Sequence, residues 1–269
     1  MKYRTVFISD IHLGMRWSKA AELSSFLSRV QCEKLYIVGD LFDSWKQRCR
    51  ARLPESHRGV LDAVTRMAKK IRVCYVTGNH DDFMDRFDGF RLGGVSVCRK
   101  TSHTTADERR FLVIHGDEFD VVTRYRKWLE SLGDAAYMLA LYVNQGMNRI
   151  RSSLGMSYWS LSSYLKQRVK SIVAKAGDFE KNLASEVRRI GHHGVICGHI
   201  HRPAIRYLGD VLYCNTGDWV ESCSVLVEHN DGTMEILRWR DGRLHGEIRE
   251  RAVRVDFSLD NWLSGEAAG

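Results

Sequence analysis

Five short polar clusters in this sequence carry side chains that bind divalent metal ions. Each cluster follows directly on a short run of apolar residues, which indicates a buried strand that ends where the polar residues begin. The run at 35–38, for example, leads into Gly39 and Asp40. An ionised carboxylate at such a place must find a metal, a cation or water, because burying it alone costs several kcal/mol. The metal-capable residues of the five clusters are Asp10, His12, Asp40, Asn79, His115, His199 and His201.

The elements around these clusters predict an α/β fold with parallel strands. Apolar runs at 6–8, 35–38, 72–77, 111–114 and 195–197 precede the clusters, and helical periodicity at 19–30 and 55–70 connects the first three runs. Taken singly, each cluster has a structural explanation, such as a helix N-cap, a turn, a hydrogen-bonded core histidine or a hairpin edge. Because the carboxyl ends of parallel strands share one edge, five clusters together favour a common site.

Composition restricts the class of protein and its partners. The chain has 269 residues, 44% of them hydrophobic, and can bury a sizeable core without disulfides. Its seven cysteines include no Cys-x-x-Cys pair, which is typical of a reducing compartment and argues against a thiolate zinc site. The N-terminus enters a strand at once and lacks a signal-peptide pattern, so we expect a cytoplasmic protein. No stretch has the roughly 18 apolar residues that a membrane-spanning helix needs.

The formal net charge of +8 admits three kinds of partner: nucleic acid, an anionic membrane surface or a phosphorylated small molecule. Most of the excess lies between residues 121 and 190, where 12 basic residues face five acidic ones. Helical patterns at 121–132, 135–149, 159–176 and 178–190 fill this segment. Residues 135–143 are apolar around the whole helix, which suits an acyl pocket or a membrane interface, although ordinary core packing explains the pattern equally well.

The donor chemistry indicates two catalytic metal ions. Imidazole, carboxylate and amide donors without thiolate suit Mn²⁺, Fe²⁺ or Zn²⁺, and seven ligands are about right for two ions that share a bridging carboxylate. In this order the motifs resemble the signature of the calcineurin-like metallophosphoesterases over residues 3–228. The motifs are Asp10-x-His12, Gly39-Asp40, Gly78-Asn79-His80-Asp81, His115-Gly116-Asp117 and Gly198-His199-x-His201.

The resemblance implies a four-layer αββα sandwich with a helical cap insertion, two divalent ions and a role for each motif residue. His80 would protonate the leaving oxygen or stabilise charge on the phosphorus, and Asp81 would orient His80; a structural turn is the alternative for this pair. Mn²⁺ is the expected metal, with Fe²⁺ or Zn²⁺ as alternatives. One ion would take Asp10, His12 and His201, the other Asn79, His115 and His199, and Asp40 would bridge both.

Further residues resemble the UDP-2,3-diacylglucosamine diphosphatases of lipid A biosynthesis, which release UMP from a nucleotide-linked lipid. The resemblance rests on residues 39–45, 115–120 and 198–204 and on the helical insertion between His115 and His199. The well-known branch has Arg where this chain has His80, and residues 215–221 resemble a related branch. The implied partner is an amphiphilic phosphorylated molecule, with peripheral association at the inner face of the membrane.

These patterns predict a catalytic domain of residues 1–120 and 192–240, a cap of residues 121–191 and a charged, poorly ordered tail of residues 241–269. Two other functions fit the same motifs. A phosphodiesterase or nuclease of the same fold would use the basic segment on nucleic acid, although basic residues interleaved with an apolar helix suit a lipid surface better. A non-catalytic interaction module would require lost ligands, and none of the seven is missing. The sequence does not indicate the oligomeric state.

Overall fold

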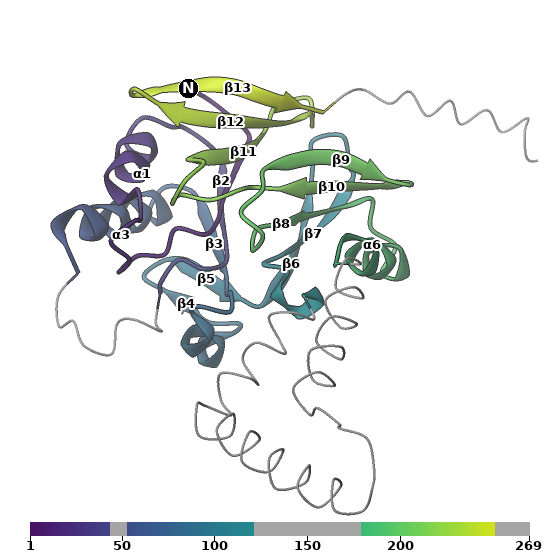
Figure 1. Ribbon diagram of the computed structural model, residues 1–269, viewed down its shortest axis with the longest axis horizontal. Helices are drawn as coiled ribbons and strands as arrows, with labels where there is room; N and C mark the ends of the chain where they lie inside the picture. Colours follow the sequence, from purple (N-terminus) through teal and green to yellow (C-terminus); the bar gives the residue numbers. More distant parts are fainter. Residues whose placement is uncertain (44–52, 121–178, 251–269) are drawn as a thin grey trace, which may run out of the picture.

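Two β-sheets packed face to face form the centre of the protein, and helices cover the outer face of each sheet (Figure 1). The computed structural model describes residues 1–43, 53–120 and 179–250. The four layers are therefore helix, sheet, sheet and helix, which confirms the predicted αββα sandwich. Of the predicted cap at residues 121–191, residues 121–178 lie outside the described residues.

The first sheet has eight strands in the order β13-β12-β11-β1-β2-β3-β5-β4. Strands β1, β2, β3 and β5 run parallel, and β11 pairs antiparallel with β1. The strands are β1 Thr5–Ile8, β2 Lys34–Val38, β3 Arg72–Val76, β4 Arg91–Leu92, β5 Val95–Cys98, β11 Ser224–Glu228, β12 Met234–Arg240 and β13 Arg243–Arg249.

The second sheet has five strands in the order β6-β7-β8-β10-β9, with β7, β8 and β10 parallel. These strands are β6 Lys100–Thr104, β7 Arg110–Ile114, β8 Gly194–Cys197, β9 Ala204–Leu208 and β10 Val211–Asn215. Between the sheets lies a core to which both contribute, including Phe7 and Val38 from the first and Phe111 and Ile196 from the second.

Three α-helices form the outer layers among the described residues. Helices α1 (Ala20–Leu27) and α3 (Glu55–Ala68) cover the first sheet, and α6 (Phe179–Arg189) covers the second. The sequence places α6 in the cap, but its apolar residues Leu183 and Val187 pack against strands β7, β8 and β10. Short 3₁₀ helices, η1 (Asp82–Phe87) and η2 (Asp117–Phe119), follow the polar clusters after β3 and β7. In the described part of the chain, no helix is long and apolar enough to cross a membrane.

Strand β1 shows why these apolar runs become central strands. Val6 and Ile8 point into the core under α1 and α3, whereas Phe7, between them, points into the core between the sheets. Successive side chains of a strand face opposite sides of the sheet, so a strand covered on both faces needs an unbroken apolar run. All four residues of β1 are buried.

The C-terminal prediction was wrong for residues 241–250. Residues of β13 pair antiparallel with β12, so the first sheet gains an edge strand where the sequence predicts a poorly ordered tail. Most side chains of β13 are exposed, because an edge strand needs backbone hydrogen bonds more than buried apolar side chains. Residues 251–269 lie outside the described residues.

Candidate metal centre

The predicted metal ligands gather at one edge of the molecule, where the parallel strands of both sheets end. Asp10 and His12 follow β1, Asp40 follows β2 and Asn79 follows β3 of the first sheet. His115 follows β7, and His199 and His201 follow β8 of the second sheet. Asp10, His12, Asp40, Asn79 and His115 are at most 4% exposed.

Five of these side chains, together with His80, form three overlapping groups in which the donor atoms lie within 4.8 Å of one another. His12 Nε2 lies 3.8 Å from Asp40 Oδ2, and His115 Nε2 lies 3.3 Å from the same oxygen. On the other side, His201 Nε2 lies 3.1 Å from Asp10 Oδ1. The three groups are Asp10, His12 and His201; His12, Asp40 and His80; and Asp10, Asp40 and His115. Asp40 thus stands between the donors of the two sheets.

The donor atoms fit a divalent cation. Within the described residues, His12 Nε2 and His115 Nε2 are buried and form no hydrogen bond, although both face the Asp40 carboxylate. Buried polar atoms normally have partners, and a metal ion supplies one for several donors at once. The other ring nitrogen of His115 donates to the carbonyl oxygen of Val38 at 3.0 Å, which fixes the ring with Nε2 toward the cluster.

The carboxylates of the cluster suit a cation, and against the effect of burial their charge raises the pKa of His115 and His201. Burial lowers the pKa of His12, which favours the neutral imidazole that coordinates metals. Burial opposes ionisation of Asp40, but the nearby His115 outweighs it and lowers the pKa of this carboxyl below its usual value. The pKa of Asp10 is likewise lowered: burial acts against this, but the hydrogen bond with His201 and the charges of His115 and His201 together outweigh burial. Both carboxylates are therefore charged at neutral pH.

Five of the seven predicted ligands have a left-handed backbone. Non-glycine residues rarely adopt positive φ, and each such residue costs about 1–3 kcal/mol. Strained residues of this kind collect at functional sites, where the surrounding structure imposes them. The residues, with φ between +51° and +70°, are Asp10, His12, Asp40, His199 and His201.

Two glycines leave room for the ligands to approach. A Cβ atom on Gly39 would lie 2.1 Å from His115 Nδ1, and Gly39 itself has φ of +85°. A Cβ atom on Gly78 would lie 2.3 Å from Asp40 Oδ1. Real Cβ contacts under 3.0 Å do not occur, so these positions admit only glycine while the ligands keep their places.

The structure gives His80 a different partner from the predicted one. His80 Nδ1 lies 3.3 Å from Asp43 Oδ1, and the His80 ring packs edge-on against the His12 ring with centroids 4.8 Å apart. Asp81 is fully buried and accepts hydrogen bonds from the backbone of Gly78 and Leu41 at 2.6 and 2.7 Å. The Asp81 carboxylate thus connects two strand-end turns, and the orientation of His80 by Asp81 stays a prediction. Sequence reasoning placed Asp43 in the motif of residues 39–45 but did not pair it with His80.

Among the predicted histidine and aspartate ligands, His199 is the one that is in none of the three donor groups. Its Nε2 contacts Asp120 Oδ2 at 2.9 Å, and its backbone N–H donates to Asp10 Oδ2 at 3.0 Å. Its ring lies edge-on to the His115 ring, with centroids 5.2 Å apart. A carboxylate behind a histidine is a frequent arrangement around metals, since it fixes the ring and leaves the other nitrogen for the ion.

The family model of the calcineurin-like phosphoesterases matches residues 3–203, so this chain belongs to that family. It is a metal-dependent hydrolase, as predicted, and the family implies a centre of two divalent ions.

Relatives with similar sequences indicate a branch of this family. A UDP-2,3-diacylglucosamine hydrolase of Shewanella baltica (strain OS185) is 30% identical over 242 residues, which cover 85% of this chain and 95% of that protein. A UDP-2,3-diacylglucosamine hydrolase of Neisseria meningitidis serogroup B is 27% identical over 240 residues, with the same coverage. These matches confirm the resemblance to that branch.

Solved structures are more distant. A single mutant of Vps29 from Entamoeba histolytica aligns with 92% of this chain and 99% of its own, at 14% identity and a TM-score of 0.46. The phosphoesterase Yfce from E. coli aligns with 91% of this chain and 97% of its own, at 15% identity and a TM-score of 0.44.

Proposed function

We propose that this enzyme hydrolyses the pyrophosphate of UDP-2,3-diacylglucosamine, or of a similar nucleotide-linked lipid, and releases UMP. The observation that carries the proposal is the cluster of Asp10, Asp40, His115 and His201 at the joint edge of the two sheets. The branch of the family is supported by the named relatives, which match 85% of this chain.

The seven predicted ligands would hold two divalent ions. Asp10, His12 and His201 would bind one ion, Asn79, His115 and His199 the other, and Asp40 both. For His199 we expect Nδ1 to bind, because Nε2 faces Asp120. Mn²⁺ is our expected metal, and Fe²⁺ and Zn²⁺ suit the same donors. When bound, such a pair lowers the pKa of a coordinated water and neutralises charge on the phosphoryl oxygens.

His80 is our candidate for the group that assists departure of the leaving group. It is 24% exposed, so it can reach both the buried ligands and a substrate in solvent. Asp43, 1% exposed and 3.3 Å away, would hold the ring, and the ring would pass a proton to the leaving oxygen. Asp81 would act on the site through the turns that place Asp40 and Asn79.

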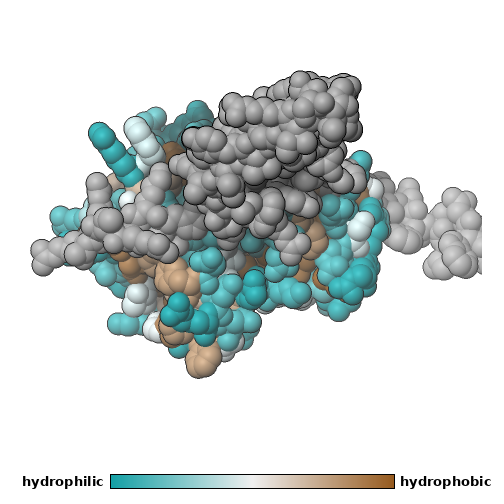
Figure 2. Space-filling model, turned by 60° about the horizontal axis from the view of Figure 1, so that its bottom comes forward, coloured by the Kyte–Doolittle hydropathy of each residue, from teal (hydrophilic) through white to brown (hydrophobic). Residues whose placement is uncertain are grey.

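Exposed apolar side chains a few residues from the metal ligands in the sequence support an amphiphilic substrate. Trp17, 66% exposed, lies in the loop after His12, and Phe83, 37% exposed, lies in η1 directly after Asp81. Phe83 contacts Phe42, with ring centroids 6.0 Å apart. Figure 2 shows apolar surface among the hydrophilic surface of the described residues on this view. Such groups suit the acyl chains of a lipid better than the backbone of a nucleic acid.

We also propose that the enzyme works in the cytoplasm and meets its substrate at the inner face of the membrane. The net charge of +8 supports attraction to anionic lipid, which is worth about 1 kcal/mol per basic residue near the surface.

The test is release of UMP from UDP-2,3-diacylglucosamine in the presence of Mn²⁺, with Asp40→Asn as the control. We expect metal-dependent release by the wild type and none by the variant. A parallel panel contains cyclic nucleotides, aryl phosphodiesters and single-stranded DNA. Absence of UMP release above the control, with turnover of another panel member, would overturn the proposed substrate while keeping the family assignment.

A further inference from the structure

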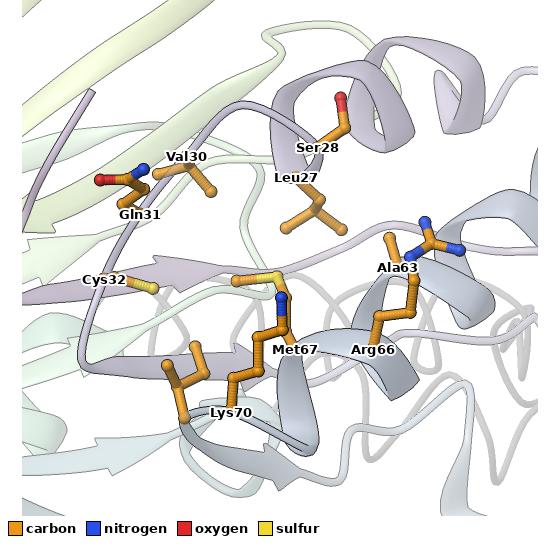
Figure 3. Close-up of a pocket in the computed structure, with 10 residues that line it drawn as sticks. Leu27, Ser28, Val30, Gln31, Cys32, Ala63, Arg66, Met67 and Lys70 are labelled. Carbon is orange, nitrogen blue, oxygen red and sulfur yellow. The ribbon is translucent and has the colours of Figure 1, made fainter.

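A hollow with apolar walls lies between the ends of α1 and α3, and none of the predicted metal ligands lines it. Its volume is about 440 Å³, and its apolar wall includes Leu27, Val30 and Met67. In Figure 3, Leu27 and Val30 approach from the α1 side and Met67 from α3, while Arg66 and Lys70 extend charged ends around them. The hollow has the size of a small-molecule site, for which about 300–1,000 Å³ is usual.

A basic cleft of about 530 Å³ adjoins this hollow, since Lys70 and Ile71 line both. Its wall contains one carboxylate, that of Glu33. Five cations face this single acid: Lys34, Lys69, Lys70, Arg72 and Arg91.

Within the part of the chain that the structure describes, these cations have no acidic partner in an ion pair. Within the described residues, none of the five forms an ion pair, and neither does Arg66. Arginines elsewhere on the described surface do: Arg188 pairs with Asp210 and Arg189 with Glu186. Cations grouped without acids repel one another, and an anion bound among them relieves that repulsion.

Lys34 lies among these positive charges. It is half-buried at the start of β2, and burial together with the charges of Arg4 and Arg72 lowers its pKa below the usual lysine value. The carboxylates of Glu228 and Glu33 act in the opposite direction without restoring it. The cleft therefore holds more positive charge than its own acids balance.

We propose that the hollow and the cleft together form a second, non-catalytic site for an anionic amphiphile: a single apolar chain that carries a phosphate headgroup. The chain would lie against Leu27, Val30 and Met67, and the phosphate would meet Lys70 and Arg72. Because an apolar wall and a group of cations adjoin each other, one molecule with an apolar chain and an anionic head would fit both. A nucleic acid backbone would leave the apolar wall unused, and a neutral lipid would leave the cations unpaired.

This site is separate from the metal centre. Lys34 and Arg72 begin β2 and β3, whereas Asp40 and Asn79 follow the ends of the same strands. A five-residue strand is roughly 16 Å long, so the two sites lie at opposite ends of the first sheet. Binding at the second site thus requires no metal, and it is independent of the substrate proposed above.

The test is calorimetric titration of the metal-loaded enzyme with dodecyl phosphate below its micelle-forming concentration. Inorganic phosphate supplies the headgroup alone, and dodecyl maltoside supplies the chain with a neutral head. We expect dodecyl phosphate to bind more tightly than either, and a site of the same affinity to persist after the metals are removed with EDTA. Equal binding of inorganic phosphate or of dodecyl maltoside would overturn the proposal.

Variants locate the binding. Lys70→Gln and Arg72→Gln each remove one charged contact and are expected to weaken dodecyl phosphate about tenfold. Met67→Gln places an amide in the apolar wall and should also weaken it. Arg58→Gln is the matched control, because Arg58 is an exposed cation of α3 that lines neither hollow nor cleft. Thermal melts verify that each variant is folded. Unchanged affinity in folded Lys70→Gln and Arg72→Gln, or equal loss in Arg58→Gln, refutes the site.

Discussion

Replacement of Gly39 by alanine should damage both stability and metal binding. The new Cβ would lie 2.1 Å from His115 Nδ1, 2.3 Å from Cγ and 2.7 Å from Cβ of the same residue. Because the clash reaches back to Cβ, rotation of the ring alone cannot relieve it. His115 must move, and the hydrogen bond from its Nδ1 to Val38 is then lost.

The expected cost has two parts. Alanine in a left-handed conformation costs about 1–2 kcal/mol. Loss of the partner of a buried donor costs about 1–3 kcal/mol more. The sum, about 2–5 kcal/mol, is a large share of the stability of an ordinary domain. The displaced His115 also leaves Asp40, so we expect the metal content per chain to fall as well.

Gly89→Ala is the matched control. Gly89 has φ of +80°, close to the +85° of Gly39, but a Cβ atom there meets nothing within 4 Å. Gly89→Ala should therefore lose only the stability that the left-handed backbone costs, and its metal content should be unchanged. Urea unfolding and elemental analysis of dialysed protein measure the two effects. Equal losses of stability in the two variants, or full metal content in Gly39→Ala, would refute the reasoning.

Three further predictions concern the site and the sheets. His80→Ala should slow turnover with the metal content unchanged, and Asp43→Asn should slow turnover less. Because Asp43 is proposed to act through His80, the double variant should be no slower than His80→Ala. Steady-state kinetics in which the two effects multiply would contradict this. Hydrogen bonds from His103 and Thr5 outweigh burial and lower the pKa of Glu228 to about 2 from 4.5, so this carboxylate contributes about 3 kcal/mol above pH 4.5 that is lost as the pH falls toward 2. The difference in unfolding free energy between wild type and Glu228→Gln should therefore narrow as the pH falls through that range. A difference that stays constant would contradict this prediction. Removal of the metals with EDTA should lower the melting temperature and abolish turnover, both restored by Mn²⁺; a melting temperature insensitive to EDTA would show that the metals do not stabilise the fold.

The sequence predicts the central strands well because they are covered on both faces. The apolar runs that became β1, β2, β3, β7 and β8 match the structure to within a residue or two. Edge strands carry no such signal. β6 reads Lys-Thr-Ser-His-Thr with His103 as its one buried residue, and most of β13 is exposed. Their strand conformation comes from pairing with β7 and β12, which periodicity does not reveal.

The sequence predicts which residues gather at the candidate site, but not which of their side chains contact one another. Strand ends place Asp10, Asp40, His115 and His201 at one edge by topology alone. Which carboxylate contacts His80 depends on the conformation of two turns, because Asp43 and His80 are 37 residues apart in the chain. Asp81, the sequence neighbour of His80, points away into the backbone of those turns.

The division of the ligands between the two sheets has a mechanical consequence. Asp10 and Asp40 extend from the first sheet and His115 and His201 from the second, so a bound ion is a cross-link between the layers. The inner core, with Phe7 against Tyr36 and His103, determines how the sheets lie on one another. A substitution in that core, remote from the ligands, would change the separation of the donor atoms. The affinity of this protein for metal therefore depends on how its two sheets are aligned.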